Sequence, residues 1–124
     1  MTPLDELARS AVDAWNRGDG PAYRQLTGTG FAYEETATGR RVVGVDRMLD
    51  EWRALRAAYP DVTVEVLGVE IRGQTTLTRV AWRGTGAGGD RDGKHLELWD
   101  LVTTRWRRGR AVAERHHVGI LGLV

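Results

Sequence analysis

The sequence predicts an α+β fold, in which N-terminal helices cover one face of a curved antiparallel sheet and leave a central pocket between the two layers. Apolar residues recur at helical spacing only before Pro60, and after it they alternate with polar residues as in β-strands. With 124 residues and no internal repeat, the chain is predicted to form a single domain, residues 1–124, that is long enough for a hydrophobic core.

Three helices are predicted in the first half of the chain. The first spans about residues 3–17, with Thr2 as its N-cap, because apolar residues recur there at the spacing of one helix face. A short helix spans about residues 19–27. The third begins at an N-cap formed by Asp46 and ends before Pro60, which cannot continue a helix.

A short hairpin is predicted between the second and third helices. Its first strand spans residues 31–37 and follows a Thr-Gly-Thr-Gly connector at 27–30, and its second strand spans residues 41–43. Glu35 has the same alternating phase as Tyr33, so its carboxylate is predicted to face the pocket.

The rest of the chain reads as strands. The apolar phase changes within the strand at 62–71, which indicates a β-bulge at 67–68. The next strand spans about 75–83, and a glycine-rich loop at 84–93 leads into a final hairpin at 93–119. That loop matches a dinucleotide-binding glycine pattern but continues into a strand, so it lacks the helix N-terminus that would hold a pyrophosphate.

The final hairpin carries titratable residues at positions where apolar ones are expected. We predict a three-residue loop ending at Gly109, which pairs Trp106 with Arg110. In this register Asp100 lies directly opposite His116, at a Cβ separation of about 5 Å. Asp100 and His116 can then act as base and acid near neutral pH. A structural ion pair within the sheet is an equally good interpretation of the same residues.

Composition excludes several classes of function. The chain has no cysteine, which excludes disulfides, thiolate metal sites and cysteine nucleophiles. A net charge of +1 argues against nucleic acid or an anionic membrane as a partner. No apolar run approaches the roughly 20 residues of a membrane-spanning helix, and the start does not resemble a secretory signal, so we expect a cytoplasmic protein. We expect no metal, since His116 is the only one of the three histidines predicted to face the pocket, and no cofactor.

Five stretches of the chain carry a family resemblance. They are Ala14-Trp15-Asn16-Arg17-Gly18-Asp19, Tyr33-Glu34-Glu35-Thr36-Ala37-Thr38-Gly39, Gly44-Val45-Asp46, Tyr59-Pro60-Asp61 and Arg105-Trp106-Arg107-Arg108-Gly109-Arg110. On these stretches the chain resembles the SnoaL-like polyketide cyclase branch of the superfamily shared by nuclear transport factor 2 and ketosteroid isomerase. The resemblance implies a cone-shaped α+β barrel that dimerises through the outer face of its sheet, where Trp99 is predicted to lie.

The resemblance also implies roles for individual residues. Glu35 falls where similar isomerases carry the aspartate that acts as general base. His116 falls near the position of a catalytic aspartate in similar cyclases and limonene epoxide hydrolases. The chain departs from the isomerase pattern at Ala11 and Val102, where an oxyanion-binding tyrosine and aspartate are expected. Steroid isomerisation by that apparatus is therefore disfavoured.

We predict an enzyme that needs no cofactor and acts on a small, apolar, carbonyl-bearing or polyketide-like substrate by cyclisation or isomerisation. Epoxide opening by an activated water, and ligand binding without turnover, remain alternatives. The candidate catalytic residues are Glu35, Asp100 and His116. The candidate substrate-binding residues are Tyr33, Trp15, Trp52, Leu98, Val102, Glu114 and Val118. The aromatic members of this set also suit a packing role, which is the commoner fate of buried tryptophans.

Overall fold

The structure of the chain is a computed structural model that describes residues 2–118. In this part of the chain, three α-helices precede or interrupt the first strands: α1 spans Leu4–Arg17, α2 spans Gly20–Gln25 and α3 spans Val45–Ala58. The predicted helices are therefore present, but two of the predicted caps are wrong. Pro3 and not Thr2 is the N-cap of α1, and Gly44 is the N-cap of α3, so that Asp46 lies in its first turn.

Within residues 2–118, six strands form one sheet. They are β1 (Thr27–Glu35), β2 (Arg41–Val43), β3 (Thr63–Arg72), β4 (Thr75–Thr85), β5 (His95–Arg107) and β6 (Arg110–His116). The connector predicted at 27–30 is instead the beginning of β1. The glycine-rich loop holds a short 3₁₀ helix at Gly89–Arg91.

The strand order is β2-β1-β6-β5-β4-β3. Every neighbouring pair is antiparallel except β1 and β6, which run parallel. The predicted all-antiparallel sheet is therefore wrong at this pair. Because β1 and β6 come from opposite ends of the chain, no hairpin links them, and local sequence patterns do not fix their relative direction.

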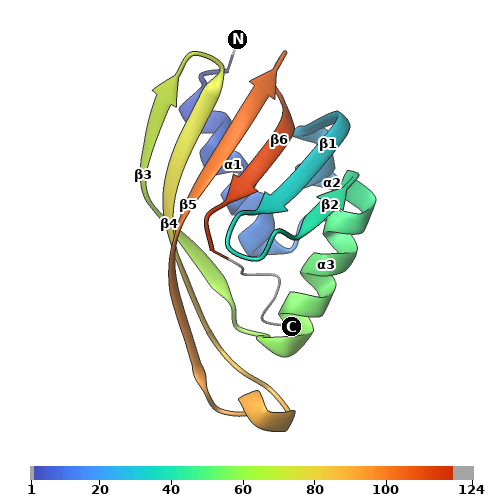
Figure 1. The fold of residues 1–124 in the computed structure, drawn as a ribbon, viewed down its shortest axis with the longest axis vertical. Helices are drawn as coiled ribbons and strands as arrows, with labels where there is room; N and C mark the ends of the chain where they lie inside the picture. Colours follow the sequence, from blue (N-terminus) through green and yellow to red (C-terminus); the bar gives the residue numbers. More distant parts are fainter. Residues whose placement is uncertain (1, 119–124) are drawn as a thin grey trace.

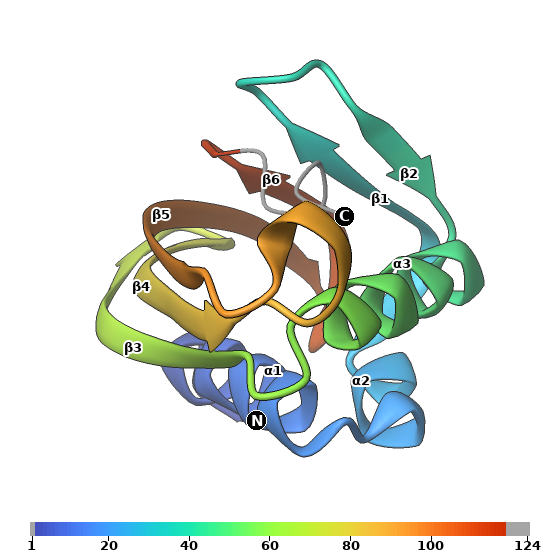
Figure 2. The ribbon, with the colours of Figure 1, turned by 90° about the horizontal axis from the view of Figure 1, so that it is seen from below.

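The sheet curves around the helices. Seen from below in Figure 2, the strands of the sheet form an arc, and the helices lie on its concave side. Helix α1 packs against β3 and β4, and α3 packs against β1 and β2 at the other end of the arc (Figure 1). The α+β architecture predicted from the sequence is confirmed.

A β-bulge bends β3 as the sequence predicts. The pairing of β3 with β4 shifts register between Val66 and Gly68, which is where the apolar phase of the sequence changes. A bulge increases the local twist of a strand, so it helps this long strand to curve around α1.

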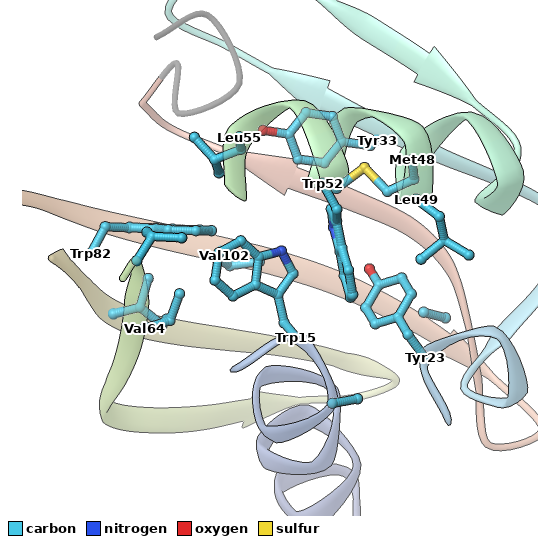
Figure 3. Packing of buried hydrophobic residues seen from close by; sticks show 14 of the residues in the cluster. Trp15, Tyr23, Tyr33, Met48, Leu49, Trp52, Leu55, Val64, Trp82 and Val102 are labelled. Atoms are coloured by element: carbon cyan, nitrogen blue, oxygen red, sulfur yellow. The ribbon is translucent and has the colours of Figure 1, made fainter. Parts of the chain in front are cut away.

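Aromatic side chains fill the space between the sheet and the helices (Figure 3). The ring of Trp15 from α1 packs edge-to-face against Trp52 from α3 and Trp82 from β4, with centroids 5.6 and 4.9 Å apart. Tyr23 from α2 packs in the same way against Trp52, at 4.5 Å. The core therefore joins all three helices to the sheet through one aromatic cluster.

Candidate active site

An apolar pocket lies between the concave face of the sheet and the helices. Its volume is about 60 Å³, and its walls come from all three helices and from five of the six strands. A dry cavity of about 150 Å³ is known to hold benzene. A ring-sized ligand therefore requires some side chains of the wall to move, and the flexible Met48 is one of them.

Asp100 and His116 contact each other, although not in the predicted register. His116 Nδ1 lies 2.6 Å from Asp100 Oδ2, and both residues are buried. Val102 is the residue paired with His116 across the sheet, and Asp100 lies two positions before Val102 in β5. The two side chains thus make a diagonal contact, which is within reach for neighbours on one face of a sheet.

Two local features shift the register of β6. The β5–β6 loop has two residues, Arg108 and Gly109, with φ angles of 52° and 76°. The predicted three-residue loop is wrong, because Arg108 does adopt the left-handed conformation that a side chain disfavours. A register shift at Val112 then moves β6 by one further residue. Two one-residue shifts return the side chains that follow Val112 to their predicted face of the sheet, so the acid and the imidazole still meet.

The second oxygen of Asp100 is held by the backbone that follows β6. Asp100 Oδ1 accepts hydrogen bonds from the backbone N–H groups of His117 and Val118, at 3.0 and 3.2 Å. Both oxygens of this carboxylate are therefore occupied. Asp100 does not line the pocket, and its contacts fix the orientation of the His116 ring.

The other ring nitrogen of His116 lies beside Glu114. His116 Nε2 is 3.5 Å from Glu114 Oε1 and makes no hydrogen bond within residues 2–118. Glu114 Oε2 accepts a hydrogen bond of 3.0 Å from the hydroxyl of Tyr23. Glu114, His116 and Tyr23 all line the pocket, so they are its main polar groups.

The flanking carboxylates control the charge of His116. Burial alone would lower the pKa of His116, but hydrogen bonding to Asp100 and the negative charges of Glu114 and Asp100 outweigh burial and raise the pKa to about 9. His116 is then an imidazolium at neutral pH, placed between two carboxylates. Burial and the charge of Glu114 also raise the pKa of Tyr23, which keeps its hydroxyl proton.

Glu35 occupies a separate buried position. It is 1% exposed and accepts hydrogen bonds from the hydroxyls of Tyr33 and Thr38, at 2.6 and 3.1 Å. The ring of Tyr33 lies 4.7 Å from that of His116, so it stands between Glu35 and the imidazole. Glu35 faces inward, as its phase predicts, but it does not line the pocket.

The predicted substrate-binding residues divide into two groups. Trp15, Trp52, Val102 and Glu114 line the pocket. Tyr33, Leu98 and Val118 lie outside its walls within the described part of the chain. The binding and catalytic roles of both groups remain predictions.

Sequence reasoning missed several residues of the pocket. Tyr23 lies on a helix of six residues, which is too short for periodicity to reveal its buried face. Trp82 has the same inward phase as Val80 and could have been found from it. Trp52 and Trp82 also have buried indole N–H groups without a hydrogen-bond partner among residues 2–118.

The described residues form neither a metal-binding cluster nor a membrane-spanning helix. Within residues 2–118, no group of three or more histidine, aspartate or glutamate side chains has the arrangement of a metal site. No helix in that part of the chain has the length and apolar character needed to cross a bilayer.

Comparison with known proteins points to one family. A family model described as SnoaL-like polyketide cyclase matches residues 5–124. No curated protein sequence matches the chain significantly.

Solved structures show the same fold. IdmH, a proposed polyketide cyclase from Streptomyces antibioticus, is 24% identical with a TM-score of 0.82, over 93% of this chain and 91% of its own. A proposed SnoaL-like polyketide cyclase from Jannaschia sp. CCS1 is 16% identical with a TM-score of 0.76, over 99% and 92%. A protein with a ketosteroid isomerase-like fold from Catenulispora acidiphila, solved with trimethylamine, is 16% identical with a TM-score of 0.80, over 96% and 88%.

Proposed function

Because the chain belongs to the SnoaL-like polyketide cyclase family, we propose that it is an enzyme that transfers a proton next to a carbonyl group of a small, largely apolar substrate. Such a step begins an aldol cyclisation or a double-bond isomerisation, and it needs one base and one acid at the reacting atoms. The observation that carries the proposal is the contact between Glu114 and His116 in the wall of an apolar pocket.

Glu114 is the proposed base. Among the carboxylates near His116, Glu114 lines the pocket, whereas Asp100 and Glu35 do not. The hydrogen bond from Tyr23 orients its carboxylate toward the pocket wall. The assignment of Glu35 or Asp100 as the base stays a prediction from the sequence, and the contacts favour Glu114 over both.

His116 is the proposed acid. As Glu114 removes a proton from the carbon next to the carbonyl, the electron pair of the C–H bond moves toward the carbonyl oxygen. A protonated His116 stabilises that oxygen by donating from Nε2, the nitrogen that makes no hydrogen bond among the described residues. Asp100 holds the ring through Nδ1 and so acts as a positioning residue. Glu114 takes up the proton that leaves the carbon, and His116 supplies the proton that the oxygen needs. These two transfers need no cofactor.

Exchange of carbon-bound protons tests this proposal without a known substrate. We expect the protein to accelerate the exchange of the α-protons of cyclohexanone with D₂O, measured by proton NMR. Glu114→Gln and His116→Gln should each lower the rate by about 10²–10⁴-fold, the usual contribution of one acid–base group.

Glu35→Gln is the matched control, because it removes a buried carboxylate that lies outside the pocket wall. Loss of exchange in Glu35→Gln but not in Glu114→Gln would restore the assignment made from the sequence. If circular dichroism shows a folded protein that never accelerates exchange, a binding protein without turnover replaces the proposed enzyme.

Epoxide opening is a second candidate, favoured by the Asp100–His116 pair. Such a pair can orient an activated water. Reaction in H₂¹⁸O separates the two candidates, since hydrolysis places solvent oxygen in the product and cyclisation does not.

We also propose that a second copy of the chain covers the outer face of the sheet. Trp99 lies on that face with 62% of its surface exposed, which is unusual for a tryptophan in the middle of a strand. Size-exclusion chromatography with light scattering should show a dimer that Trp99→Lys converts to a monomer. Val43→Lys, at an exposed position on the edge strand β2, should leave the dimer intact. A wild-type monomer would contradict the proposal.

A further inference from the structure

Within the described part of the chain, every buried side-chain atom without a hydrogen-bond partner is a nitrogen. These atoms belong to Trp52, Arg56, Trp82 and His116. A buried N–H group without an acceptor destabilises the folded state, so each one calls for an explanation. Three of the four residues line the pocket, and Arg56 does not. The pocket wall therefore offers hydrogen-bond donors that lack acceptors.

Trp82 is the tryptophan donor that lies beside the imidazole. Its ring centroid is 6.3 Å from that of His116, and the two ring planes are tilted by 52°. The ring of Trp52 packs against Trp15, on the helical side of the pocket. The guanidinium of Arg56 lies 4.4 Å from the ring centroid of Trp15, and this cation–π contact gives its charge a partner. The unpartnered donors of Trp82 and His116 are therefore neighbours in one wall.

Two such donors can share one oxygen atom. A carbonyl oxygen accepts two hydrogen bonds, and a hydrogen bond from an N–H group is about 2.9 Å long. Two nitrogens that share an oxygen are then at most about 5.8 Å apart. Rings with centroids 6.3 Å apart allow this separation between Trp82 Nε1 and His116 Nε2. Both residues line the same cavity of about 60 Å³, so an oxygen bound by both lies inside the cavity.

Trp106 shows that the fold can supply an acceptor to a buried indole. Its N–H donates a hydrogen bond of 2.9 Å to the hydroxyl oxygen of Thr76. Trp106 and Trp82 are both buried, and both line the pocket. The N–H of Trp82 differs in having no partner among residues 2–118. Trp106 is therefore an internal reference for a partnered indole in the same wall.

We propose that the indole N–H of Trp82 donates a hydrogen bond to the carbonyl oxygen of the substrate, together with Nε2 of His116. This inference rests on the proposed function and adds a catalytic residue to it. Ala11 and Val102 line the same pocket but have no side-chain donor. The second hydrogen bond thus comes from β4, and not from positions 11 or 102, where the family resemblance implies donors.

The charges of the wall favour this arrangement. Before the reaction, negative charge lies on Glu114, beside the protonated His116. When Glu114 takes up the proton from carbon, its carboxyl becomes neutral. The electron pair of the broken C–H bond forms the new carbon–carbon double bond, and the negative charge arises on the substrate oxygen. Charge thus moves within the pocket and is not added to it. Donors that are already in place stabilise this oxygen without reorganisation.

Exchange kinetics of Trp82→Phe test the inference. The change keeps an aromatic ring and removes the indole N–H. We expect kcat for α-proton exchange of cyclohexanone to fall by about 10²–10³-fold with little change in KM, because such a donor acts mainly on the transition state. Trp106→Phe is the matched control, because it makes the same change in the same wall where the N–H already has a partner. It should lower kcat far less.

Indole N–H signals test the contact without a substitution, so the test stands even if Trp82→Phe does not fold. In ¹⁵N-labelled wild-type protein, cyclohexanone should move the Nε1–H signal of Trp82 downfield in proton NMR, because a new hydrogen bond forms. The signal of Trp106, which already donates to Thr76, should keep its position.

Urea unfolding separates a catalytic role from a structural one. Trp82→Phe and Trp106→Phe remove the same atoms from buried positions. Trp106→Phe also breaks the hydrogen bond to Thr76, whereas the N–H of Trp82 has no partner to lose among residues 2–118. The unfolding midpoint should therefore fall further in Trp106→Phe than in Trp82→Phe.

The possible results have distinct meanings. An unchanged kcat in folded Trp82→Phe, or a Trp82 signal that stays in place when cyclohexanone binds, would overturn this inference. The proposed function would stand if wild type still exchanged α-protons and Glu114→Gln did not. Equal losses of kcat in Trp82→Phe and Trp106→Phe would also overturn the inference, because packing would explain both. Failure of wild type to accelerate exchange would overturn the inference and the proposed function together.

Discussion

Replacing Asp100 by asparagine should change how the stability of the protein depends on pH. The carboxylate of Asp100 lies 2.6 Å from His116 Nδ1 and helps to raise the pKa of His116 from 6.5 to about 9. A group whose pKa is raised by folding stabilises the folded state fully below its unfolded pKa. That contribution is lost as the pH rises through the folded pKa.

The size of the effect follows from these two values. At about 1.4 kcal/mol for each tenfold change in proton affinity, His116 contributes about 3 kcal/mol to the free energy of unfolding below pH 6.5. Most of this is lost by pH 9, the folded pKa of His116. Total stabilities of single domains are about 5–15 kcal/mol, so the loss is a large fraction. In Asp100→Asn, the His116 ring stays buried but loses one neighbouring carboxylate, so the pKa of His116 should fall. The free energy of unfolding should then depend less strongly on pH.

Urea unfolding followed by tryptophan fluorescence at pH 6, 7, 8, 9 and 9.5 measures the effect. The difference in unfolding free energy between wild type and Asp100→Asn should be largest at pH 6 and shrink by up to about 3 kcal/mol toward pH 9.5. His116→Gln should show no such dependence, since the titrating group is absent. Asp13→Asn, which alters an exposed ion pair with Arg17, should follow the wild type. A difference that stays constant or grows between pH 6 and 9.5 would refute the reasoning.

Two further predictions concern single side chains. Arg108→Asn should raise the free energy of unfolding by about 1 kcal/mol, because asparagine tolerates the left-handed φ of 52° better than arginine does. The same change at Arg107, which lies in β5, should give no gain in urea unfolding, and an equal gain at both positions would show that φ is not the cause. Tyr23→Phe should lower the free energy of unfolding by about 1.5–3 kcal/mol, because it removes a hydrogen bond to the half-buried Glu114 carboxylate. Tyr59→Phe is its control in thermal unfolding, since the hydroxyl of Tyr59 hydrogen-bonds nothing among residues 2–118; equal losses in both variants would contradict the role assigned to Tyr23.

Periodicity was sufficient for most of the architecture. Apolar spacing identified α1 and α3, and the change of phase at 67–68 located the bulge in β3. The signals were local, because each depends on residues within a few positions of one another. No local signal sets the relative direction of β1 and β6, which come from opposite ends of the chain. The prediction of a wholly antiparallel sheet was wrong for this pair.

The register of the last hairpin shows why a site is harder to predict than a fold. Alternation in β5 and β6 placed Asp100, Glu114 and His116 on the inner face, and that face is the one observed. The loop type and the register shift at Val112 were both missed, and the two errors offset each other. A single shift would have turned every side chain of β6 to the opposite face.

The sequence by itself determined which side chains face inward and which titratable groups stand among apolar ones, because a strand alternates its faces whatever its partners are. Tertiary structure alone decided which carboxylate meets the pocket. Asp100, Glu35 and Glu114 all have inward phases, but their surroundings differ. The Asp100 carboxylate accepts hydrogen bonds from backbone N–H groups. The Glu35 carboxylate accepts them from the hydroxyls of Tyr33 and Thr38. Glu114 lies in the pocket wall beside the imidazole of His116. These contacts join residues from distant parts of the chain, and they exist only once the sheet has curved around its helices.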